Sequence, residues 1–147
     1  MNETRQICTF ILNGFLYGIE VTRVQEVIRY QDMTRVPLSP PDVRGLINLR
    51  GQIVAAVDTR KRLGLPAADA DMLPMNVVIR TDEGVASLLV DEIGDVIEVS
   101  ADLLEVVPET VPATTRGVLR GVYKLKDRLL LELDVDKLVG GKSKRAA

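Results

Sequence analysis

"VRGLINLRGQIVAAVDTRKRLG", residues 43–64, has a second version in the same chain, because residues 119–140 read "LRGVYKLKDRLLLELDVDKLVG". The two stretches share an Arg-Gly pair near the start, a central Leu, and an Asp, a Lys and a Gly toward the end. The matching pairs are Arg44/Arg120, Gly45/Gly121, Leu49/Leu125, Asp58/Asp134, Lys61/Lys137 and Gly64/Gly140. Unrelated segments of this length share about one residue at average usage. The chain therefore contains an internal repeat, which predicts two copies of one structural unit.

A predicted β-hairpin precedes each copy. Asn13-Gly14 separates two apolar runs in "ICTFILNGFLYGIEV", and both residues tolerate the positive φ of a type I′ turn. "NVVIR" and "VASLLV" form a similar pair around Asp82-Glu83-Gly84, which we expect to be a slightly longer turn. The hairpins also repeat, since "YGIEVTRVQEVI" aligns with "ASLLVDEIGDVI" and Glu26 with Asp95. Each half of the chain is therefore predicted to begin with a β-hairpin.

Strand periodicity continues inside each copy. Alternate apolar positions define one face of a predicted strand, with Ile53, Ala55 and Val57 in the first copy and Leu129, Leu131, Leu133 and Val135 in the second. Each strand runs into a short charged turn, "DTRKRLG" or "DVDKLVG". We expect Asp58 and Asp134 to cap one helical turn each, and a Gly to end it.

Gly and Pro residues punctuate the rest of the chain. Pro37, Pro40 and Pro41 interrupt the loop of the first half, and Pro108 and Pro112 interrupt that of the second, where they exclude a central strand or a long helix. Many short, regularly spaced strands indicate an all-β protein. We expect a single domain over residues 5–147, built from two pseudo-symmetric β-barrels of about five strands at approximately 5–72 and 73–140, with a short basic tail at 141–147.

The composition excludes several classes of protein. The 147 residues carry a net charge of −2, with 3% aromatic residues, one Cys, no His and no Trp. Imidazole catalysis and an internal disulfide are therefore excluded, and no phosphate-loop or Cys/His metal motif is present. We expect no catalytic residue, no cofactor and no metal. Cys8 is interpreted as a reduced, buried strand residue, and Asp69, Asp71 and Asp91-Glu92 as solvated carboxylates in turns or linkers.

The chain resembles the CheW family of bacterial chemotaxis coupling proteins along nearly its whole length. The residues that carry the resemblance are "YGIEVTRVQEVI", "TRVPLSPPDVRGLINLRGQIV", "VDTRKRLGL", "LLVDEIGDVIEV" and "LRGVYKLKDRLLLELDVDKL". The resemblance implies two five-stranded SH3-like barrels and a free-standing, non-enzymatic adaptor. Ala55-Ala56 departs from the family's usual Pro followed by a larger apolar residue, and Thr59 stands where Leu is usual. We expect these changes to loosen local packing slightly.

The same resemblance implies two partners and their sites. The groove between the barrels is expected to receive the cytoplasmic helical hairpin tip of a chemoreceptor, with Val24, Glu26 and Arg50 as receptor-facing residues. The first barrel is expected to contact the regulatory domain of a CheA-type histidine kinase, through Arg44, Gly45, Leu46 and Asn48. Three structural alternatives remain: an exposed Glu26–Arg50 salt bridge, a core position for Val24, and a backbone requirement for Gly45, which both copies share.

The positions at which the two copies differ are better candidates for a functional role than the positions that they share. Asn48 corresponds to Lys124, and Arg50-Gly51 to Lys126-Asp127, so only the first copy has the surface that resembles a CheW contact site.

No apolar run approaches the roughly 20 residues that cross a bilayer, so we expect a cytoplasmic protein. The resemblance further implies an adaptor that is held at the inner face of the membrane through receptor arrays. The alternatives are a CheW-like protein of a twitching or developmental pathway and, from another class, a nucleic-acid-binding barrel. The negative charge and the few aromatic residues disfavour a nucleic-acid partner.

Overall fold

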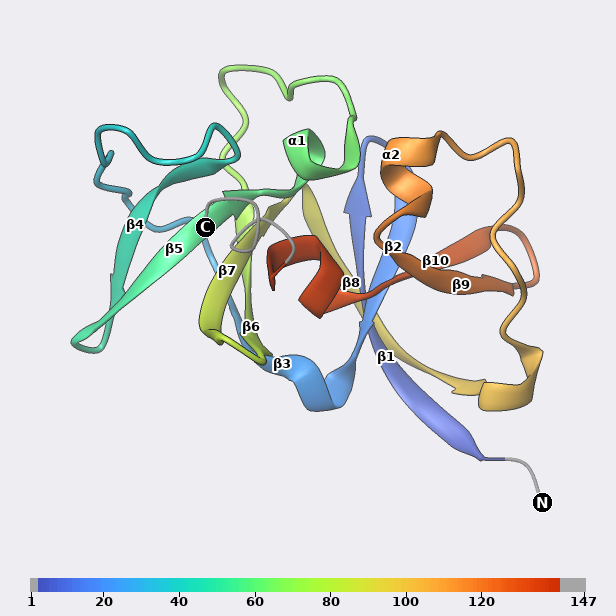
Figure 1. The fold of residues 1–147 in the computed structure, drawn as a ribbon. Coiled ribbons are helices and arrows are strands. Elements are labelled where there is room, and N and C mark those ends of the chain that lie inside the picture. The colour runs from blue at the N-terminus through green and yellow to red at the C-terminus, as the bar shows by residue number, and fades with distance from the viewer. Residues whose placement is uncertain (1–2, 141–147) are drawn as a thin grey trace.

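The computed structural model describes residues 3–140, which form ten strands and a few short helical turns (Figure 1). The strands are β1 (Thr4–Leu12), β2 (Phe15–Glu20), β3 (Val24–Ile28), β4 (Val43–Leu49), β5 (Gln52–Asp58), β6 (Met75–Thr81), β7 (Gly84–Val90), β8 (Glu92–Ser100), β9 (Leu119–Lys124) and β10 (Leu129–Leu133). The helical turns are η1 (Val21–Arg23), α1 (Thr59–Leu63), η2 (Ala101–Leu103), α2 (Ala113–Arg116) and η3 (Asp136–Gly140). The tail predicted at 141–147 lies outside the described residues.

The strands form two five-stranded sheets with equivalent topology. Sheet A has the order β8-β1-β2-β10-β9, and sheet B has the order β3-β6-β7-β5-β4. Strand pairs are antiparallel, except β10 with β2 and β5 with β7, which are parallel. The sheets do not close into complete rings, but their SH3-like character agrees with the predicted all-β fold of two similar units.

The boundary between the two barrels differs from the prediction. Sheet A combines the β1-β2 hairpin of the first half with β8, β9 and β10 of the second, and sheet B takes its β6-β7 hairpin from the second half. Figure 1 shows this exchange, with the blue β1 and β2 beside the orange and red β9 and β10. A cut at residues 72 and 73 therefore does not separate the sheets. The repeat alone does not determine which hairpin joins which sheet, because each hairpin has the same pattern whichever copy it joins.

Both predicted hairpins are present. Asn13 and Gly14 have φ values of 52° and 82° and form the two-residue turn between β1 and β2, as a type I′ turn requires. The second turn is shorter than expected, because strand pairing continues to Thr81↔Gly84 and leaves only Asp82-Glu83 between the strands. Gly84 has a φ of 125°, which favours glycine at this position.

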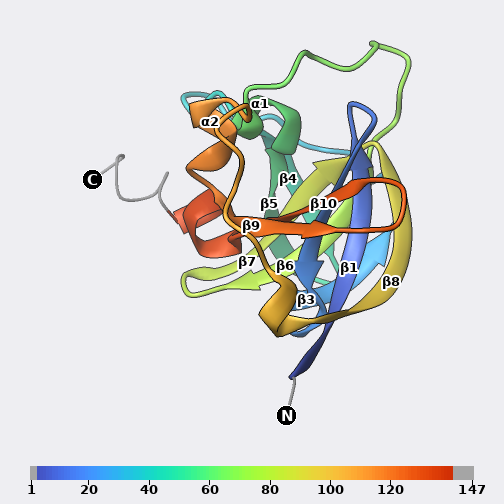
Figure 2. The same ribbon diagram turned by 90° about the vertical axis from the view of Figure 1, so that its right-hand side faces the viewer.

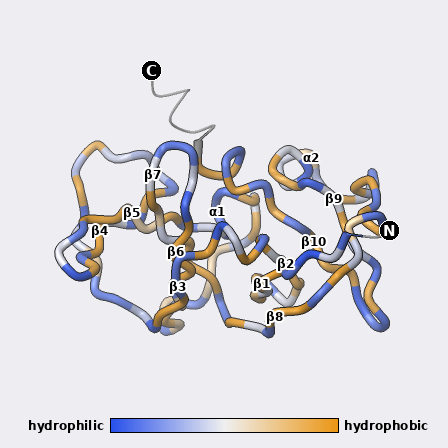
Figure 3. Tube along the Cα trace, turned by 90° about the horizontal axis from the view of Figure 1, so that it is seen from below, coloured by the Kyte–Doolittle hydropathy of each residue, from blue (hydrophilic) through white to orange (hydrophobic). Residues whose placement is uncertain are grey.

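The core joins the two sheets into one packed body. One large cluster contains buried side chains from both sheets, such as Phe10 and Leu131 of sheet A and Val77 and Leu88 of sheet B. Smaller clusters lie within sheet B, around Ile47, and within sheet A, around Ile7, Tyr123 and Leu130. Hydrophobic and hydrophilic residues alternate along much of the chain (Figure 3). Central strands such as β10 are nevertheless buried on both faces, one against each kind of cluster.

The connection between the halves runs outside the sheets. Figure 2 shows the green segment after α1 rising away from both sheets before it returns to β6. The contacts that hold it include the bond from Arg60 Nη1 to the Pro66 carbonyl at 2.7 Å and the packing of Leu65 against the core. The helical turns α1 and α2 pack against each other beneath it, where the buried Thr115 hydroxyl donates to the Leu63 carbonyl at 2.7 Å.

Candidate functional site

Glu26 and Arg50, two of the predicted receptor-facing residues, form a bidentate ion pair. The two guanidinium nitrogens lie 2.5 and 2.6 Å from the two carboxylate oxygens. The Glu26 side chain is 19% exposed and that of Arg50 is 73% exposed, so the pair lies at the surface with the arginine outermost. The hydrogen bonds from Arg50 lower the pKa of Glu26, which keeps the carboxylate charged.

The backbone places Arg50 at the tip of a hairpin. Arg50 and Gly51 have φ values of 50° and 87° and form a two-residue turn between the paired residues Leu49 and Gln52. The Asn48 side chain accepts a hydrogen bond from the Gly51 amide at 2.9 Å and stabilises this turn. Arg50 therefore has a fixed backbone direction toward β3, and Asn48 has a structural role in addition to its predicted contact role.

The ion pair links the two edges of sheet B. Glu26 lies on β3 and Arg50 lies at the end of β4, and these are the outermost strands of the sheet. A side-chain pair thus joins edges that no backbone ladder connects. Val24 is less accessible, because it pairs with Ile79 through the backbone and packs against the large shared core. Val24 is half-buried, so the structure places it at the border between the core and the surface.

The predicted kinase-facing residues divide into two groups. Arg44, Leu46 and Asn48 alternate along β4 on one side of sheet B; Arg44 and Asn48 are exposed and Leu46 is half-buried. Gly45 is buried between them. A Cβ at Gly45 would lie 2.8 Å from the Thr34 carbonyl oxygen and 3.0 Å from the Met33 Cβ. Gly45 is therefore needed for the close passage of the β3–β4 connection, which agrees with the backbone requirement considered as the alternative for this residue.

The second copy shows the same glycine requirement. A Cβ at Gly121 would lie 2.6 Å from the Glu105 carbonyl oxygen and 2.8 Å from Leu104 Cδ1. In each copy an isolated backbone bridge follows directly, Thr34↔Leu46 in the first and Glu105↔Val122 in the second. The repeated Arg-Gly pair thus marks a crossing point of the fold, as its presence in both copies predicted.

Ile53 is a candidate that the sequence interpretation missed. It pairs across the ladder with Asn48, on the same side as Leu46 and Ala55, and its side chain is 59% exposed. The strand periodicity placed Ile53 on one face with Val57, which is buried. A signal was available in the pairing with Asn48, a polar residue that indicates a solvent-facing position. Arg44, Leu46, Asn48 and Ile53 together form what we call the β4–β5 face.

The repeated aspartates act as predicted. The Asp58 carboxylate accepts a hydrogen bond from the Lys61 amide at 3.1 Å, and Gly64 ends α1 with a φ of 76°. The Asp134 carboxylate accepts from the Lys137 amide, also at 3.1 Å. Asp58 additionally lies 3.7 Å from Arg44 Nη1, which connects this cap to the β4–β5 face.

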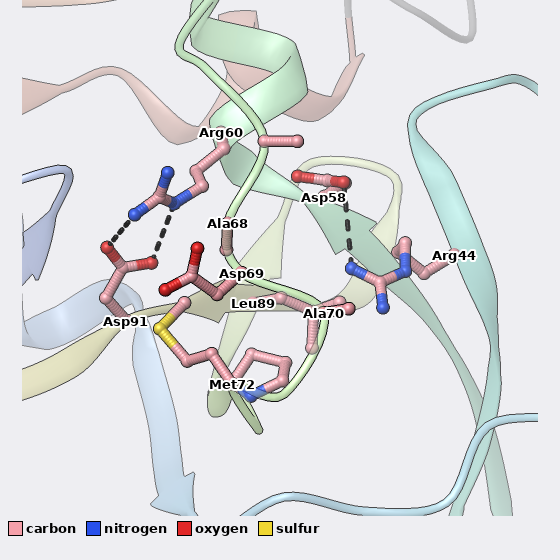
Figure 4. Close-up of a pocket in the computed structure, with 11 residues that line it drawn as sticks. Arg44, Asp58, Arg60, Ala68, Asp69, Ala70, Met72, Leu89 and Asp91 are labelled. Carbon is pink, nitrogen blue, oxygen red and sulfur yellow. Dashed lines mark hydrogen bonds and ion pairs between the residues drawn. The ribbon is translucent and has the colours of Figure 1, made fainter.

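Asp91 differs from its predicted role as a solvated carboxylate. Its side chain is 11% exposed and binds the Arg60 guanidinium at 2.5 and 2.9 Å (Figure 4). Burial raises the pKa of Asp91, but the hydrogen bonds from Arg60 and from the Asn13 amide outweigh burial, so this pKa is lowered. The pair borders a hollow of about 140 Å³ between α1 and the connecting segment, where Arg44 also pairs with Asp58. Arg44 and Arg60 are both paired with carboxylates in this hollow, so their charges are neutralised and the hollow does not form an anion site.

Other candidate chemistry is sparse in the part of the chain that the structure describes. Residues 3–140 contain no cluster of three or more His, Cys, Asp or Glu side chains arranged to hold a metal. Within the same residues, no helix has the length and apolar character needed to span a bilayer. Cys8 is buried in β1, and burial raises the pKa of its thiol.

The family of the chain follows from its whole length. Residues 6–142 match the CheW-like domain. The chain belongs to the CheW family. It is 33% identical to the chemotaxis protein CheW of Bacillus subtilis over 142 residues, which cover 97% of this chain and 91% of that protein.

Further CheW proteins agree with this assignment. The chemotaxis protein CheW of Klebsiella aerogenes is 29% identical over 135 residues, which cover 92% of this chain and 81% of that protein. The crystal structure of the scaffolding protein TtCheW from Thermoanaerobacter tengcongensis has a TM-score of 0.80 at 27% identity and covers 89% of both chains. The expected membership of the CheW family is confirmed, and the SH3-like fold agrees with a solved CheW structure.

Proposed function

We propose that this chain is a non-enzymatic scaffold that couples chemoreceptors to a CheA-type histidine kinase in chemotaxis signalling. The observation that carries the proposal is the match to the CheW-like domain over residues 6–142, together with CheW relatives that it matches over most of their length. A scaffold of this kind requires two separate surfaces on one rigid body. The shared core of the two sheets supplies such a body.

The proposed receptor surface includes Glu26 and Arg50, with Val24 beside them. A bidentate pair of fixed geometry at the surface sets the register and the charge pattern for a partner, even where its contribution to net affinity is small. The partner segment we propose is the helical hairpin tip of the receptor's cytoplasmic part. Through this contact the protein would lie at the inner face of the membrane.

The proposed kinase surface is the β4–β5 face. Arg44, Leu46 and Asn48 come from the sequence prediction, and Ile53 adds an apolar group among them. Exposed apolar side chains bordered by polar ones are typical of protein-protein contacts. The kinase partner we propose is the regulatory domain of the CheA-type protein. Gly45 supports this face from beneath through the backbone.

Reconstitution tests the proposed coupling directly. Purified receptor fragment, CheA-type kinase and this chain are mixed, and the kinase that sediments with the receptor is measured with and without the chain. We expect the chain to increase kinase recruitment and to alter the rate of kinase autophosphorylation. Recruitment that is the same without the chain would refute the coupling function for that receptor and kinase. Receptors and kinases of a twitching or developmental pathway, used in parallel, identify the pathway.

Charge reversal tests the receptor surface. Glu26→Lys or Arg50→Glu removes the ion pair, and we expect either variant to weaken receptor binding about tenfold while kinase binding changes less than about twofold. Lys126→Glu is the matched control, because Lys126 occupies the position equivalent to Arg50 in the second copy. Arg50→Asn removes the charge but keeps a residue that tolerates positive φ. Loss of both associations, or unfolding of the variants, would assign the pair to the fold instead.

A further inference from the structure

The connection between β3 and β4 contains a tight turn with an unfavourable residue. Within Val36-Pro37-Leu38-Ser39, the Ser39 amide donates to the Val36 carbonyl at 3.3 Å, and Leu38 has a φ of 67°. A Pro at the second position and a positive φ at the third are the features of a type II turn. Gly or Asn is favoured at the third position, because a branched side chain is strained there. Leu38 is thus poorly suited to its own backbone.

The Leu38 side chain gains no packing that would offset this strain. Its exposure is 104% of the reference value, and the side chain of the neighbouring Val36 is 37% exposed. Isolated exposed hydrophobic residues are common. Within residues 3–140, however, Leu38 is the only large hydrophobic residue that combines exposure with a positive φ. Residues held in strained backbone conformations cluster at functional sites such as ligand clamps and switch regions.

The turn is attached to the strand that carries the proposed kinase surface. Thr34 exchanges two backbone hydrogen bonds with Leu46, at 2.8 and 2.9 Å, which holds the connection against β4. The Val43 amide donates to the Pro40 carbonyl at 3.0 Å and brings the chain directly into β4. Figure 1 shows this connection at the end of β4 opposite to the β4–β5 turn. The 36–39 turn therefore lies near the start of β4, since its residues and Val43 line one open hollow, and Arg50 lies in the turn at the other end of that strand.

The charge around the turn defines the complementary surface. Arg35 is exposed, and no ion pair joins it to a carboxylate of residues 3–140. Four other arginines of residues 29–62 are paired with carboxylates, so the charge that Arg35 carries beside the turn is not neutralised in the same way; the paired residues are Arg44, Arg50, Arg60 and Arg62. A surface that approaches this region gains from negative charge. The apolar tip and its neighbouring cation thus call for an apolar pocket with a carboxylate at the rim.

We infer that Leu38 is a docking residue for the kinase partner, inserting into an apolar pocket whose rim carries a carboxylate that faces Arg35. The inference rests on the proposed function, because it extends the kinase surface from the β4–β5 face to the 36–39 turn. The turn holds the leucine outward before binding, so little conformational freedom is lost when the pocket closes around it. Arg35 fixes the orientation of the contact and raises the rate of association.

Replacement of Leu38 by glycine separates binding from stability. Leu38→Gly removes the side chain and also relieves the backbone strain, so we expect kinase binding to weaken about tenfold or more while the thermal midpoint stays equal or rises. Binding of the full chain to the purified CheA-type kinase is measured by calorimetry, and unfolding by circular dichroism. Leu73→Gly is the matched control, since Leu73 is also exposed, at 64%, but lies on the connecting segment. Leu38→Met, which keeps an apolar side chain, should restore most of the affinity.

A second pair of variants tests the charge. Arg35→Glu should weaken kinase binding and reverse part of its salt dependence, whereas Arg35→Lys should have a small effect. Unchanged affinity of Leu38→Gly, with normal binding by the wild-type chain, would overturn the inference and leave the proposed function intact. Absence of kinase binding by the wild-type chain would overturn both. Should Leu38→Gly fail to fold, Leu38→Asn removes the apolar group at a position where Asn is favoured, and normal binding by that variant would overturn the inference equally.

Discussion

Thr59 is a buried polar residue whose hydroxyl has no hydrogen-bond partner within residues 3–140. The residue is 0% exposed and begins α1 directly after the Asp58 cap. A buried hydroxyl without a partner loses its bonds to water and gains nothing in exchange. Thr59 was predicted to loosen local packing because the CheW family usually has Leu there. In the structure, the buried hydroxyl without a partner lowers the free energy of unfolding, in addition to the effect of any void.

Replacement of Thr59 by valine should therefore stabilise the protein. Thr59→Val keeps the shape and removes the hydroxyl, and we expect the free energy of unfolding to rise by about 1 kcal/mol. Urea denaturation followed by circular dichroism measures the change. Thr115→Val is the matched control, because the Thr115 hydroxyl donates to the Leu63 carbonyl and its loss should destabilise. A lower stability of Thr59→Val would mean that the hydroxyl has a bound partner in solution.

Asp91 shows where residue-scale interpretation from sequence fails. The Asp91-Glu92 pair lies between two apolar strands, which is typical of a solvated turn. The side chain is instead held by Arg60 from α1 and by the Asn13 amide from the β1–β2 turn. Both partners are distant in sequence, so the local pattern around Asp91 carries no information about them. The caps Asp58 and Asp134 were predictable because their partners lie three residues away.

At the scale of elements, the two copies of the repeat share a crossing that only glycine accommodates. The β3–β4 connection passes over Gly45, and the β8–β9 connection passes over Gly121. The Arg-Gly match between the copies therefore reflects backbone packing. The residues that differ lie at the β4–β5 turn. In the first copy the Asn48 side chain accepts a hydrogen bond from this turn, and Arg50 binds Glu26.

Substitution at Gly121 tests this crossing away from the proposed partner surfaces. Gly121→Ala places a methyl group 2.6 Å from the Glu105 carbonyl oxygen, and we expect a loss of about 2 kcal/mol in the free energy of unfolding. Gly117→Ala is the control, because its nearest contact would be an ordinary 3.6 Å and its φ is −62°. That variant should be neutral or more stable by about 0.5 kcal/mol. Equal stability of the two variants in urea denaturation would contradict a tight crossing.

At the scale of the whole molecule, the exchanged hairpins make the two halves interdependent. Each sheet contains strands from both halves, and the largest core cluster spans both sheets. A buried polar network also connects the two halves. Arg5 of β1 donates two hydrogen bonds to Glu132 of β10 and one to Tyr123 of β9, at 2.7 Å. Glu132 is 1% exposed, and its carboxylate is paired with Arg5 of the first half and, at 3.5 Å, with Arg120 of its own half.

Division of the chain tests this interdependence. We expect fragments 1–72 and 73–147 to be unfolded separately, because each lacks strands of both sheets, and to form a folded complex when mixed. Circular dichroism and amide hydrogen exchange of the separate and mixed fragments give the measurement. Mixing with a 73–147 fragment that carries Glu132→Lys is the control, since like charges at Arg5 should prevent assembly. A fragment that folds alone would show that the halves are independent barrels.

Sequence patterns alone predicted the two hairpins, the Asn13-Gly14 turn, the internal repeat and the family. These features depend on residues close together along the chain, such as Asn13-Gly14 at a turn, or on the order of motifs over its whole length. Three features became visible only in the folded chain: which hairpin joins which sheet, the burial of Asp91 and Glu132, and the exposure of Ile53 and Leu38. These depend on contacts between distant segments, and one alternating pattern is compatible with several such pairings.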